Sequence, residues 1–400
     1  MKILLIKGVS TYDASNIFID ELLRAFKILG HEACVLDFKT SQISQSEIES
    51  IDKFLPVDLI YTITILGECM SDSRISLAQA LGAPHVVQLV DFPLSHTGRI
   101  DNWPEGTATL VVDRSHVDAL LSCYPSTKFS HVAFCPAAAN GDLANICEDP
   151  NDHFASRPIP ILFPGSYQAP TTEGWEVLGS AQSIVSQAID RMLADDFLPA
   201  SDALNASMRD VGLEPDHPDY RDFRKLAYLP NEFVRAFRRM QVLEAAAKVG
   251  LPLHVYGTGY AEHLSRFPNI TYCGEAGLAQ ILPEIRRAKV VLNVNANFRH
   301  GAHDRPFAAG LGGAVIASDE STYLTEQFRP DEAAYFFRWQ TLEEDLFGLK
   351  GLIDDPTRLH AMARAGQSRV VQSHLWVHRT EKIFEAAAAA RRYLNRRAAP

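Results

Sequence analysis

The segment from Lys289 to Asp319 constrains the fold of this chain more than any other stretch of the sequence. It begins with Val290 to Val294, a short apolar run rich in β-branched residues, which predicts a buried strand. A polar loop follows, and then a short helix from Phe307 to Leu311 and a second buried strand from Ala314 to Ala317. A strand, a helix and another strand within about thirty residues predict one βαβ unit of a parallel sheet.

The start of this short helix is a candidate anion site. Asp304 can serve as the helix N-cap, and Pro306 suits the first turn because its missing N–H costs nothing there. The pair Gly312-Gly313 can end the helix through a residue in the left-handed conformation. Unpaired N–H groups and partial positive charge at a helix start, beside His303 and Arg305, favour an anion, most naturally a phosphate.

The length and composition of the chain set its broad class. Its 400 residues exceed what one compact core usually holds, so we expect two domains. An apolar content of 46% and a charged content of 22% are typical of a soluble globular protein. No apolar run approaches the roughly 18 residues that span a bilayer, and the opening MKILLIKGVS fits a first strand better than a signal peptide. We therefore expect a cytoplasmic protein, and the net charge of −11 argues against nucleic acid as its main partner.

The six cysteines do not point to a metal site. None forms a CxxC pair, and none has the spacing to a histidine that metal ligands show. We expect buried free thiols instead, because cysteine behaves as a small apolar residue in protein interiors. The six are Cys34, Cys69, Cys123, Cys135, Cys147 and Cys273.

Strand-like and helix-like segments alternate along both halves of the chain. This alternation predicts an α/β fold with two doubly wound parallel sheets, each covered by helices. We place one domain at residues 1–155 and a second at 156–374, with a helical insertion at 173–228 and a last helix at 375–397. The predicted strands are Lys2 to Lys7, Glu32 to Phe38, Leu59 to Ile65, Val86 to Val90, Thr109 to Val112, Val132 to Phe134, Ile159 to Phe163, Leu253 to Tyr256, Ile270 to Cys273, Val290 to Val294 and Ala314 to Ala317.

Four strand ends in the second half carry glycine or small polar residues. Because ligands of parallel sheets bind beyond the carboxyl ends of the strands, we expect these four loops to meet at one crevice. Each member also has a simpler explanation: glycine after a strand is ordinary turn chemistry, and Arg305 and His303 can be solvated surface residues. The four loops hold Gly165-Ser166, Gly257-Thr258-Gly259, Gly274-Glu275 and His303-Asp304-Arg305.

A carboxylate and an imidazole stand close together in the first half. Asp91 follows the strand Val86 to Val90 directly, and His96 comes five residues later. Such a pair at a strand end can remove a proton from a hydroxyl group. The alternative is that Asp91 stabilises the turn that it makes with Pro93. Both interpretations stay open at this point.

The last helix ends in a basic stretch. A basic helix end can touch an anionic membrane surface. Interaction with the negative end of the helix dipole, together with plain solvation, explains the same residues. They are Arg391, Arg392, Arg396 and Arg397.

Four pieces of sequence in the second half carry a family resemblance. They are, in order, AKVVLNVN, HDRPFAAGLGGAVIASD, FRPDEAAYFF and AGQSRVVQSHLWVHRTEKIF. An arginine-led short helix, a glycine pair and a late aromatic segment in this order resemble the C-terminal region of CgeB-like glycosyltransferases, a group with the GT-B fold. HVYGTGY and NITYCGE extend the resemblance upstream to Pro252. The first 160 residues are similar to this group only in the order of their elements.

The resemblance implies two Rossmann-like domains that face each other across a cleft, with the last helix returning to the first domain. The domain at 156–374 would hold a nucleotide sugar, the domain at 1–155 would hold the acceptor, and no metal or other cofactor would be required. Arg305 and His303 would contact the donor diphosphate, and Glu275 would lie where the nucleobase of the donor is recognised. The other residues implied to hold the donor are Gly165, Ser166, Gly257, Thr258, Asn295 and Asp304.

The implied activity is transfer of a sugar from a nucleotide-diphosphate donor to the hydroxyl of a glycan, a protein or a small molecule. Arg305 and His303 would stabilise the leaving diphosphate electrostatically. Asp91 or His96 would act as the base if the reaction inverts the sugar configuration.

One departure from the family pattern concerns the donor ribose. Many GT-B enzymes place a glutamate after the aromatic residue of the short helix, whereas here Phe307 is followed by Ala308. The main alternative to an enzyme is therefore a non-catalytic nucleotide-sugar or glycan-binding protein of the same fold. A sugar-nucleotide epimerase is a third possibility.

Overall fold

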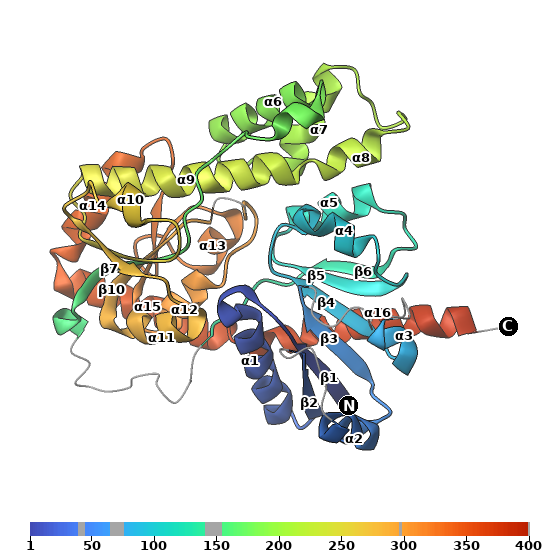
Figure 1. The fold of residues 1–400 in the computed structure, drawn as a ribbon. Helices are drawn as coiled ribbons and strands as arrows, with labels where there is room; N and C mark the ends of the chain where they lie inside the picture. Colours follow the sequence, from blue (N-terminus) through green and yellow to red (C-terminus); the bar gives the residue numbers. More distant parts are fainter. Residues whose placement is uncertain (39–44, 65–75, 141–153, 296–297, 399–400) are drawn as a thin grey trace. The chain divides into compact units, whose positions relative to one another are not determined.

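The computed structural model describes residues 1–38, 45–64, 76–140, 154–295 and 298–398 of the chain. The chain divides into two compact units, one made of Met1–Ala137 with Trp376–Pro400 and the other of Ala138–Leu375 (Figure 1). The change of unit lies before the boundary between residues 155 and 156 that we expected. The backbone N–H of Ala139 donates to the carbonyl oxygen of His374 at 2.8 Å, and this bond ties the stretch after the first unit to the second.

The first unit contains a six-stranded parallel sheet with the strand order β2-β1-β3-β4-β5-β6. Three of its four interior strands, β3, β4 and β5, are buried along their whole length, as expected for a parallel sheet that helices flank. Residue 65, at the end of the predicted third strand, lies outside the described residues. The strands are β1 (Lys2–Lys7), β2 (Glu32–Asp37), β3 (Leu59–Ile63), β4 (His85–Leu89), β5 (Thr107–Val111) and β6 (Phe129–Phe134), and the helices are η1 (Thr11–Asp13), α1 (Ala14–Ile28), α2 (Gln45–Phe54), α3 (Leu77–Leu81), η2 (Pro93–His96), α4 (Thr97–Ile100), α5 (Ser115–Cys123) and η6 (Trp376–Arg379).

The last helix, α16 (Thr380–Ala398), packs on the sheet of the first unit, where it contacts β4, β5 and β6 (Figure 1). Gly106, just before β5, makes this close approach possible. Its φ is +81°, and a methyl group there would lie 2.1 Å from the ring of Tyr393. A helix distant in sequence thus completes the cover of the first sheet, where we expected the segment 375–397 to pack.

The basic end of α16 makes contacts within its own unit. Arg391 donates to the carbonyl oxygen of Asp58 at 2.9 Å, and Arg397 pairs with the carboxylate of Glu105 at 3.1 Å. Two of the four arginines are therefore engaged in contacts within the protein. The structure does not support the idea that this end of α16 contacts a membrane. Among the described residues, no helix is long and apolar enough to cross a membrane.

The second unit contains another six-stranded parallel sheet, with the order β12-β11-β10-β7-β8-β9. The chain begins in the middle of this sheet at β7, adds β8 and β9 on one side, and then crosses to β10, β11 and β12 on the other. The strand order therefore reverses between β7 and β10, and ligands of such sheets bind at the carboxyl ends of the strands beside this switch point. The strands are β7 (Ile159–Pro164), β8 (Leu253–Tyr256), β9 (Ile270–Gly274), β10 (Ala288–Asn293), β11 (Val315–Asp319) and β12 (Tyr335–Phe337).

The short helix of the opening segment, α12 (Arg305–Leu311), ends as the sequence predicted. Gly313 adopts a φ of +71°, and the N–H of Ala314 donates to the carbonyl oxygen of Ala309 at 3.0 Å. The other helices of this unit outside the insertion are η4 (Phe154–Ser156), α10 (Ala261–Leu264), α11 (Leu278–Arg287), α13 (Thr322–Gln327), α14 (Leu342–Ile353) and α15 (Pro356–Ser373).

The predicted insertion at 173–228 is helical and joins the long helix α9 (Tyr228–Lys248). It contains η5 (Trp175–Leu178), α6 (Ala181–Ala194), α7 (Ala200–Asp210) and α8 (Tyr220–Lys225). Arg238 of α9 holds it in place: the guanidinium pairs with the buried carboxylate of Asp196 at 3.1 Å and donates to the carbonyl oxygen of Leu193 at 3.1 Å.

The cysteines that the structure describes are free thiols, of which Cys123 and Cys135 are buried and Cys34 and Cys273 are half-buried. Cys69 and Cys147 lie outside the described residues. In the same described part of the chain, no group of three or more His, Cys, Asp or Glu side chains is placed to hold a metal ion.

Candidate functional site

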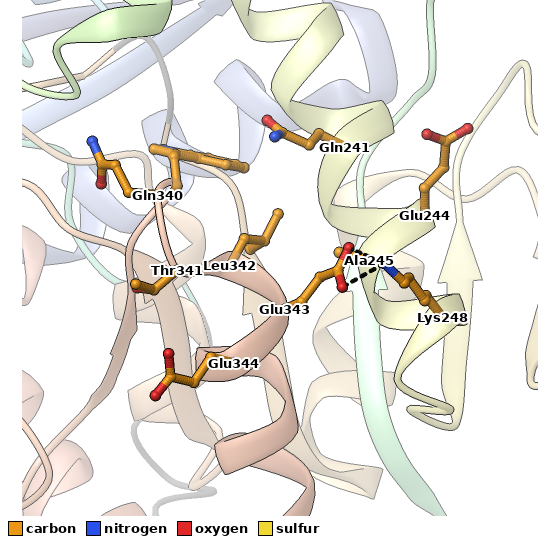
Figure 2. A pocket seen from close by; sticks show the side chains of 10 residues that line it. Gln241, Glu244, Ala245, Lys248, Gln340, Thr341, Leu342, Glu343 and Glu344 are labelled. Carbon is orange, nitrogen blue, oxygen red and sulfur yellow. Dashed lines mark hydrogen bonds and ion pairs between the residues drawn. The ribbon is translucent and has the colours of Figure 1, made fainter.

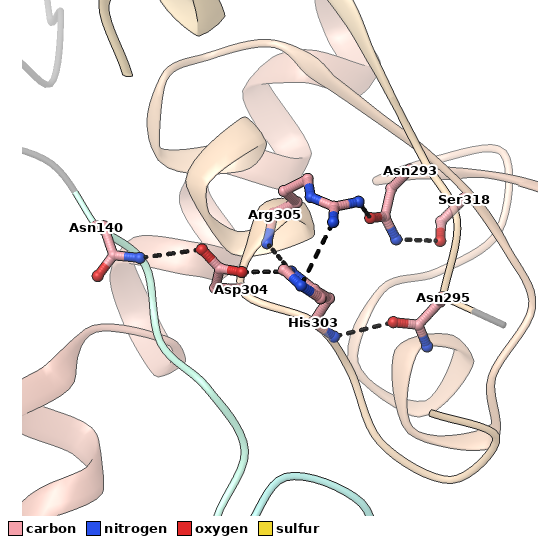
Figure 3. Close-up of polar contacts among 7 residues, drawn as sticks. All are labelled: Asn140, Asn293, Asn295, His303, Asp304, Arg305 and Ser318. Carbon is pink, nitrogen blue, oxygen red and sulfur yellow. Dashed lines mark hydrogen bonds and ion pairs between the residues drawn. The ribbon is translucent and has the colours of Figure 1, made fainter. Parts of the chain in front are cut away.

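The guanidinium of Arg305 lies at the switch point and is held there by the end of β10. Its NH1 group donates to Oδ1 of Asn293 at 2.9 Å, and Nδ2 of Asn293 donates in turn to Oγ of Ser318 at 2.9 Å (Figure 3). Asn293 and Ser318 are fully buried, whereas Arg305 is half-buried. Two polar residues at the ends of neighbouring strands therefore fix the orientation of a cation that is itself accessible.

His303 and Asp304 form a pair beside this arginine. Asp304 Oδ1 contacts Nδ1 of His303, and Asp304 Oδ2 accepts from Nδ2 of Asn140 at 3.4 Å (Figure 3). Asp304 does occupy the N-cap position of α12, but its carboxylate caps no backbone N–H there, because the backbone of Asp304 is itself helical, with φ −69° and ψ −27°. The prediction of a side-chain cap was wrong, and α12 has only 7 residues. Arg305 supplies a full positive charge at this point.

The charges around His303 favour a neutral ring. Burial and the neighbouring Arg305 lower the pKa of His303. Burial alone would raise the pKa of the Asp304 carboxyl, but His303 and Arg305 more than offset it and hold that pKa below its usual value. We assign the ring proton to Nδ1, which faces the carboxylate, so that Nε2 accepts from NH2 of Arg305 at 3.4 Å.

Asn295 fixes the loop that carries His303. Its Oδ1 accepts from the backbone N–H of His303 at 2.9 Å, and its Nδ2 donates to the carbonyl oxygens of Phe298 and Gly301 at 2.8 and 3.2 Å. The side chain is 1% exposed. Asn295 therefore acts on the site by shaping the loop.

The loops after β7 and β8 approach each other through their backbones, as the glycines predicted. Gly257 has a φ of +142°, and a methyl group on it would lie 2.4 Å from the carbonyl oxygen of Gly165. The N–H of Thr258 donates to Oγ of Ser166 at 3.3 Å. A methyl group on Gly165 would lie 3.8 Å from NH2 of Arg305. The Arg305 guanidinium therefore lies beside the loops that follow β7 and β8.

Glu275 lies farther along the same edge of the sheet. It follows β9, the edge strand, which β8 separates from β7. The N–H of Gly257 donates to the carbonyl oxygen of Gly274 at 2.9 Å, so the loops are continuous. The side chain of Glu275 is exposed.

Asp91 and His96 lie near each other in the first unit. Asp91 follows β4 and His96 ends η2, and Oδ2 of Asp91 lies 3.7 Å from Nε2 of His96. The Asp91 side chain is 55% exposed and the His96 side chain 19%, so the carboxylate is open to solvent. The structure thus brings these two predicted residues together.

Arg239, on α9, is a residue of this region that the sequence reasoning did not single out. Its NH1 group donates to the carbonyl oxygen of Ser166 at 2.9 Å. Burial and the positive charges of Arg305 and Arg235 lower the pKa of Arg239 to about 9. The available signal was the spacing of Arg235 and Arg239, four residues apart and thus on one face of a helix.

A cavity of about 620 Å³ lies elsewhere in the second unit, between α9 and the start of α14 (Figure 2). An ion pair between Lys248 and Glu343, 2.6 Å long and exposed on both sides, lies on its wall. The residues that line it include none of those predicted to bind the donor. The switch-point cluster therefore remains the candidate functional site.

Comparison with known proteins agrees with this fold. Residues 237–385 match the family described as glycosyl transferase-like. The structure is similar to that of sucrose-phosphate synthase from Thermosynechococcus elongatus, with a TM-score of 0.55 at 11% identity over 98% of this chain and 100% of that one. It is also similar to Anabaena HepE in complex with UDP-glucose, with a TM-score of 0.51 at 13% identity over 97% of this chain and 100% of that one.

A further similar structure is an alpha-glucosyltransferase in complex with UDP-glucose and DNA containing an abasic site. Its TM-score is 0.52 at 13% identity, over 97% of this chain and 98% of that one. Because this neighbour was solved with DNA, the expectation that nucleic acid is no partner gains no support from the comparison. A search among curated proteins found no match.

Two parallel six-stranded sheets with flanking helices, matched over nearly the whole chain by these structures, define a fold of the GT-B type. The predicted fold class is confirmed. Residues 237–385 match a glycosyl transferase-like family, and the predicted enzyme class, a glycosyltransferase, is confirmed as well. The narrower CgeB-like group stays a prediction.

Proposed function

We propose that this glycosyltransferase moves a sugar from a nucleoside-diphosphate donor to an acceptor hydroxyl, with the donor held by the second unit. The observation that carries the proposal is the Arg305 guanidinium, fixed by Asn293 and lying beside the backbone of Gly165. A phosphate needs a cation and close backbone approach, and this place offers both. The neighbours solved with UDP or UDP-glucose support the choice of a nucleotide sugar.

In this proposal the cations stabilise the leaving diphosphate. Negative charge develops on the diphosphate as the bond to the sugar breaks, and an oriented guanidinium such as that of Arg305 stabilises the charge without reorganising. A bound diphosphate also raises the pKa of His303, since it offsets the charge of Arg305. The ring can then donate a hydrogen bond from Nε2 while Asp304 holds its other nitrogen.

The first unit would hold the acceptor, whether a glycan, a protein or a small molecule. We assign the base of an inverting reaction to Asp91 or His96, which lie 3.7 Å apart. Of the two, Asp91 has the more exposed side chain, so its carboxylate is the better placed to contact the hydroxyl of an acceptor that binds from solution. Replacing Asp91 by Asn would then abolish transfer and leave donor affinity unchanged, and full transfer activity in that variant would exclude the role.

Calorimetric titration tests the donor site directly. The titrants are UDP, GDP, ADP, CDP and dTDP, with the matching monophosphates, against the wild type and Arg305→Ala. Arg329→Ala is the matched control, because the Arg329 side chain is 84% exposed and pairs with an exposed glutamate, Glu332. One diphosphate should bind the wild type and the control alike and bind Arg305→Ala about tenfold or more weakly. A folded wild type that binds none of the five would overturn the proposal.

The alternative, a non-catalytic binding protein, draws on Ala308. Its side chain is 2% exposed, in the interior of α12, and offers no polar group for the donor ribose. The two functions separate in a donor turnover assay. A protein that binds the sugar nucleotide but neither transfers nor hydrolyses the sugar, with any of a panel of acceptors, is a binding protein.

A further inference from the structure

The cavity between α9 and the start of α14 is lined mainly by polar side chains. Its volume of about 620 Å³ falls within the range of roughly 300–1,000 Å³ that small-molecule sites occupy. Side chains of α9 form one wall, and side chains from the loop after β12 and the first turn of α14 form the other (Figure 2). Amide and carboxylate groups predominate: Gln241 and Glu244 on α9, and Gln340, Glu343 and Glu344 on the other wall.

A buried hydrogen-bond donor in the wall of this cavity has no partner. Trp339 lines the cavity and is 6% exposed. Arg238 lies 4.6 Å above its ring and Phe337 packs edge-on at 5.5 Å, so the orientation of the ring is fixed. Its Nε1 makes no hydrogen bond to any residue that the structure describes. Because a buried indole N–H usually finds a partner, this atom indicates a ligand with an acceptor oxygen.

The charges on the cavity wall nearly cancel. Glu343 pairs with Lys248 at 2.6 Å, and Glu244 pairs with Arg266 at 2.7 Å. Glu344 makes no ion pair with any part of the chain that the structure describes. One negative charge in excess repels a phosphate, and it is too little to balance a dication. The charges therefore favour a neutral ligand.

The free hydrogen-bonding groups of the wall include both donors and acceptors. The Oε1 atom of Gln241 accepts from NH1 of Arg238 at 2.9 Å, and this bond leaves its Nε2 to donate into the cavity. The carboxylate of Glu344 can only accept, and the exposed amide of Gln340 can do both. A hydroxyl group is the neutral group that matches such a set, because it donates one hydrogen bond and accepts two.

An exposed aromatic ring stands beside these groups. Phe347 is 66% exposed on α14, and it lies four residues after Glu343 and three after Glu344, on the same face of the helix. A single exposed apolar residue needs no explanation by itself. Next to a cavity that offers hydrogen bonds to hydroxyl groups, however, it provides a flat apolar surface on which the C–H face of a sugar ring can pack.

We propose that this cavity is a saccharide-binding site, separate from the donor site, that takes a neutral sugar. The sugar hydroxyls hydrogen-bond to Gln241, Gln340, Glu344 and Nε1 of Trp339, and the apolar face of a ring packs on Phe347. The inference is independent of the proposed function, since none of these residues belongs to the donor site.

A panel of oligosaccharides tests the site by saturation-transfer difference NMR. The neutral probes are maltotriose, cellotriose, xylotriose and N-acetylated chitotriose, and the charged probes are trigalacturonate and tetralysine. The variants Glu344→Ala and Phe347→Ala change exposed side chains and should leave the fold intact. Their matched controls are Glu332→Ala, which removes another exposed carboxylate, and Val177→Ala, which removes an apolar side chain on a residue that is 88% exposed.

The wild type and both controls should bind at least one neutral trisaccharide with the same affinity. Glu344→Ala should bind it about tenfold more weakly, and Phe347→Ala roughly 3- to 10-fold more weakly. Trp339→Phe, which keeps an aromatic ring and removes the N–H, should lose affinity as well, with its unfolding midpoint measured alongside. All variants should keep the wild-type affinity for nucleoside diphosphates.

Three results would overturn the inference. The first is a wild type that binds none of the neutral saccharides, including one that binds only tetralysine or trigalacturonate. The second is equal saccharide affinity in the wild type, Glu344→Ala and Phe347→Ala, which would place the sugar elsewhere. The third is a parallel loss of diphosphate affinity in these variants, which would join the cavity to the donor site. A wild type that binds saccharide but no nucleoside diphosphate would support this inference and refute the proposed function.

Discussion

A methyl group on Gly257 would lie 2.4 Å from the carbonyl oxygen of Gly165. The two glycines follow neighbouring parallel strands, and the short distance shows that the loops after β7 and β8 touch through their main chains. Since the atoms that a side chain would meet are backbone atoms, they cannot move aside as the end of a flexible side chain can. This contact shapes the wall of the proposed donor site.

Gly257→Ala is therefore expected to damage both the fold and the site. Its destabilisation should exceed the cost of about 1–2 kcal/mol for an alanine in a left-handed backbone conformation. Gly212→Ala is the matched control, because Gly212 has a φ of +77° and open space around its Cβ position. Urea unfolding measures the stability of both variants, and calorimetry measures diphosphate binding. Equal destabilisation of the two would contradict the close approach.

Asn293 should act on donor binding through Arg305. Asn293→Ala removes the acceptor for NH1 of Arg305 and leaves the guanidinium free to turn. We expect about tenfold weaker diphosphate binding with little change in monophosphate binding. Ser318→Ala, which touches Asn293 but not Arg305, should give a smaller loss. Unchanged affinity in Asn293→Ala would mean that Arg305 needs no such support.

His303 should take up a proton when a diphosphate binds. The pKa of this ring is below its usual value of 6.5 in the free protein, and a bound anion beside Arg305 raises it. Titration of the nucleoside diphosphate that binds the wild type, in two buffers of different ionisation enthalpy, measures the protons exchanged. The wild type should take up more protons near pH 6.5 than His303→Gln does, and identical values for the two proteins would rule the ring out.

His85 should make the first unit sensitive to mild acid. Burial lowers the pKa of His85 from 6.5 to about 4. Between these two pH values the imidazole is protonated in the unfolded chain and neutral in the folded chain. The contribution to stability is complete above pH 6.5 and is lost as the pH falls toward 4, by about 3 kcal/mol in total. Urea unfolding at pH 7.5 and pH 5 should show a smaller loss of stability in His85→Gln than in the wild type. The same loss in both proteins would show that other groups cause it.

Gly106 and Tyr393 should be coupled in stability. Gly106→Ala forces a methyl group into the ring of Tyr393 and is expected to cost about 2–3 kcal/mol. Tyr393→Ala removes the ring, so the double variant should be more stable than the sum of the two single effects predicts. A double-mutant cycle measured by urea unfolding gives the coupling energy. If the effects of the two substitutions on stability were additive, Gly106 and Tyr393 would not be in contact in solution.

Local sequence patterns predicted the elements of this fold well. The β-branched run from Val290 to Val294 gave a strand, and Gly313 ended α12 in the left-handed conformation, because both features depend on near neighbours. The glycines at 165 and 257 pointed to close backbone approach for the same reason: without Cβ, they permit it.

Local sequence patterns could not predict contacts between residues that are distant in the sequence. Asp304 has the sequence of a helix cap, but a partner 164 residues away, Asn140, takes one of its oxygens. Arg239 was missed because the face of α9 that meets the β7 loop is set by packing around Arg238. The strand order of the second sheet likewise depends on which way each crossover turns, which the alternation of elements does not encode.

The place of α16 in the first unit has a consequence for synthesis of the chain. The ribosome makes Met1–Ala137, then all of Ala138–Leu375, and only afterwards the helix that covers β4, β5 and β6. Synthesis proceeds at about 5–20 residues per second, so more than about ten seconds pass between completion of the first sheet and synthesis of α16. Until then, the surface of the sheet against which Ile383 and Ala386 are buried stays exposed to solvent. During that interval the nascent first unit is open to aggregation, and a chaperone that recognises apolar sheet surface would find its target there.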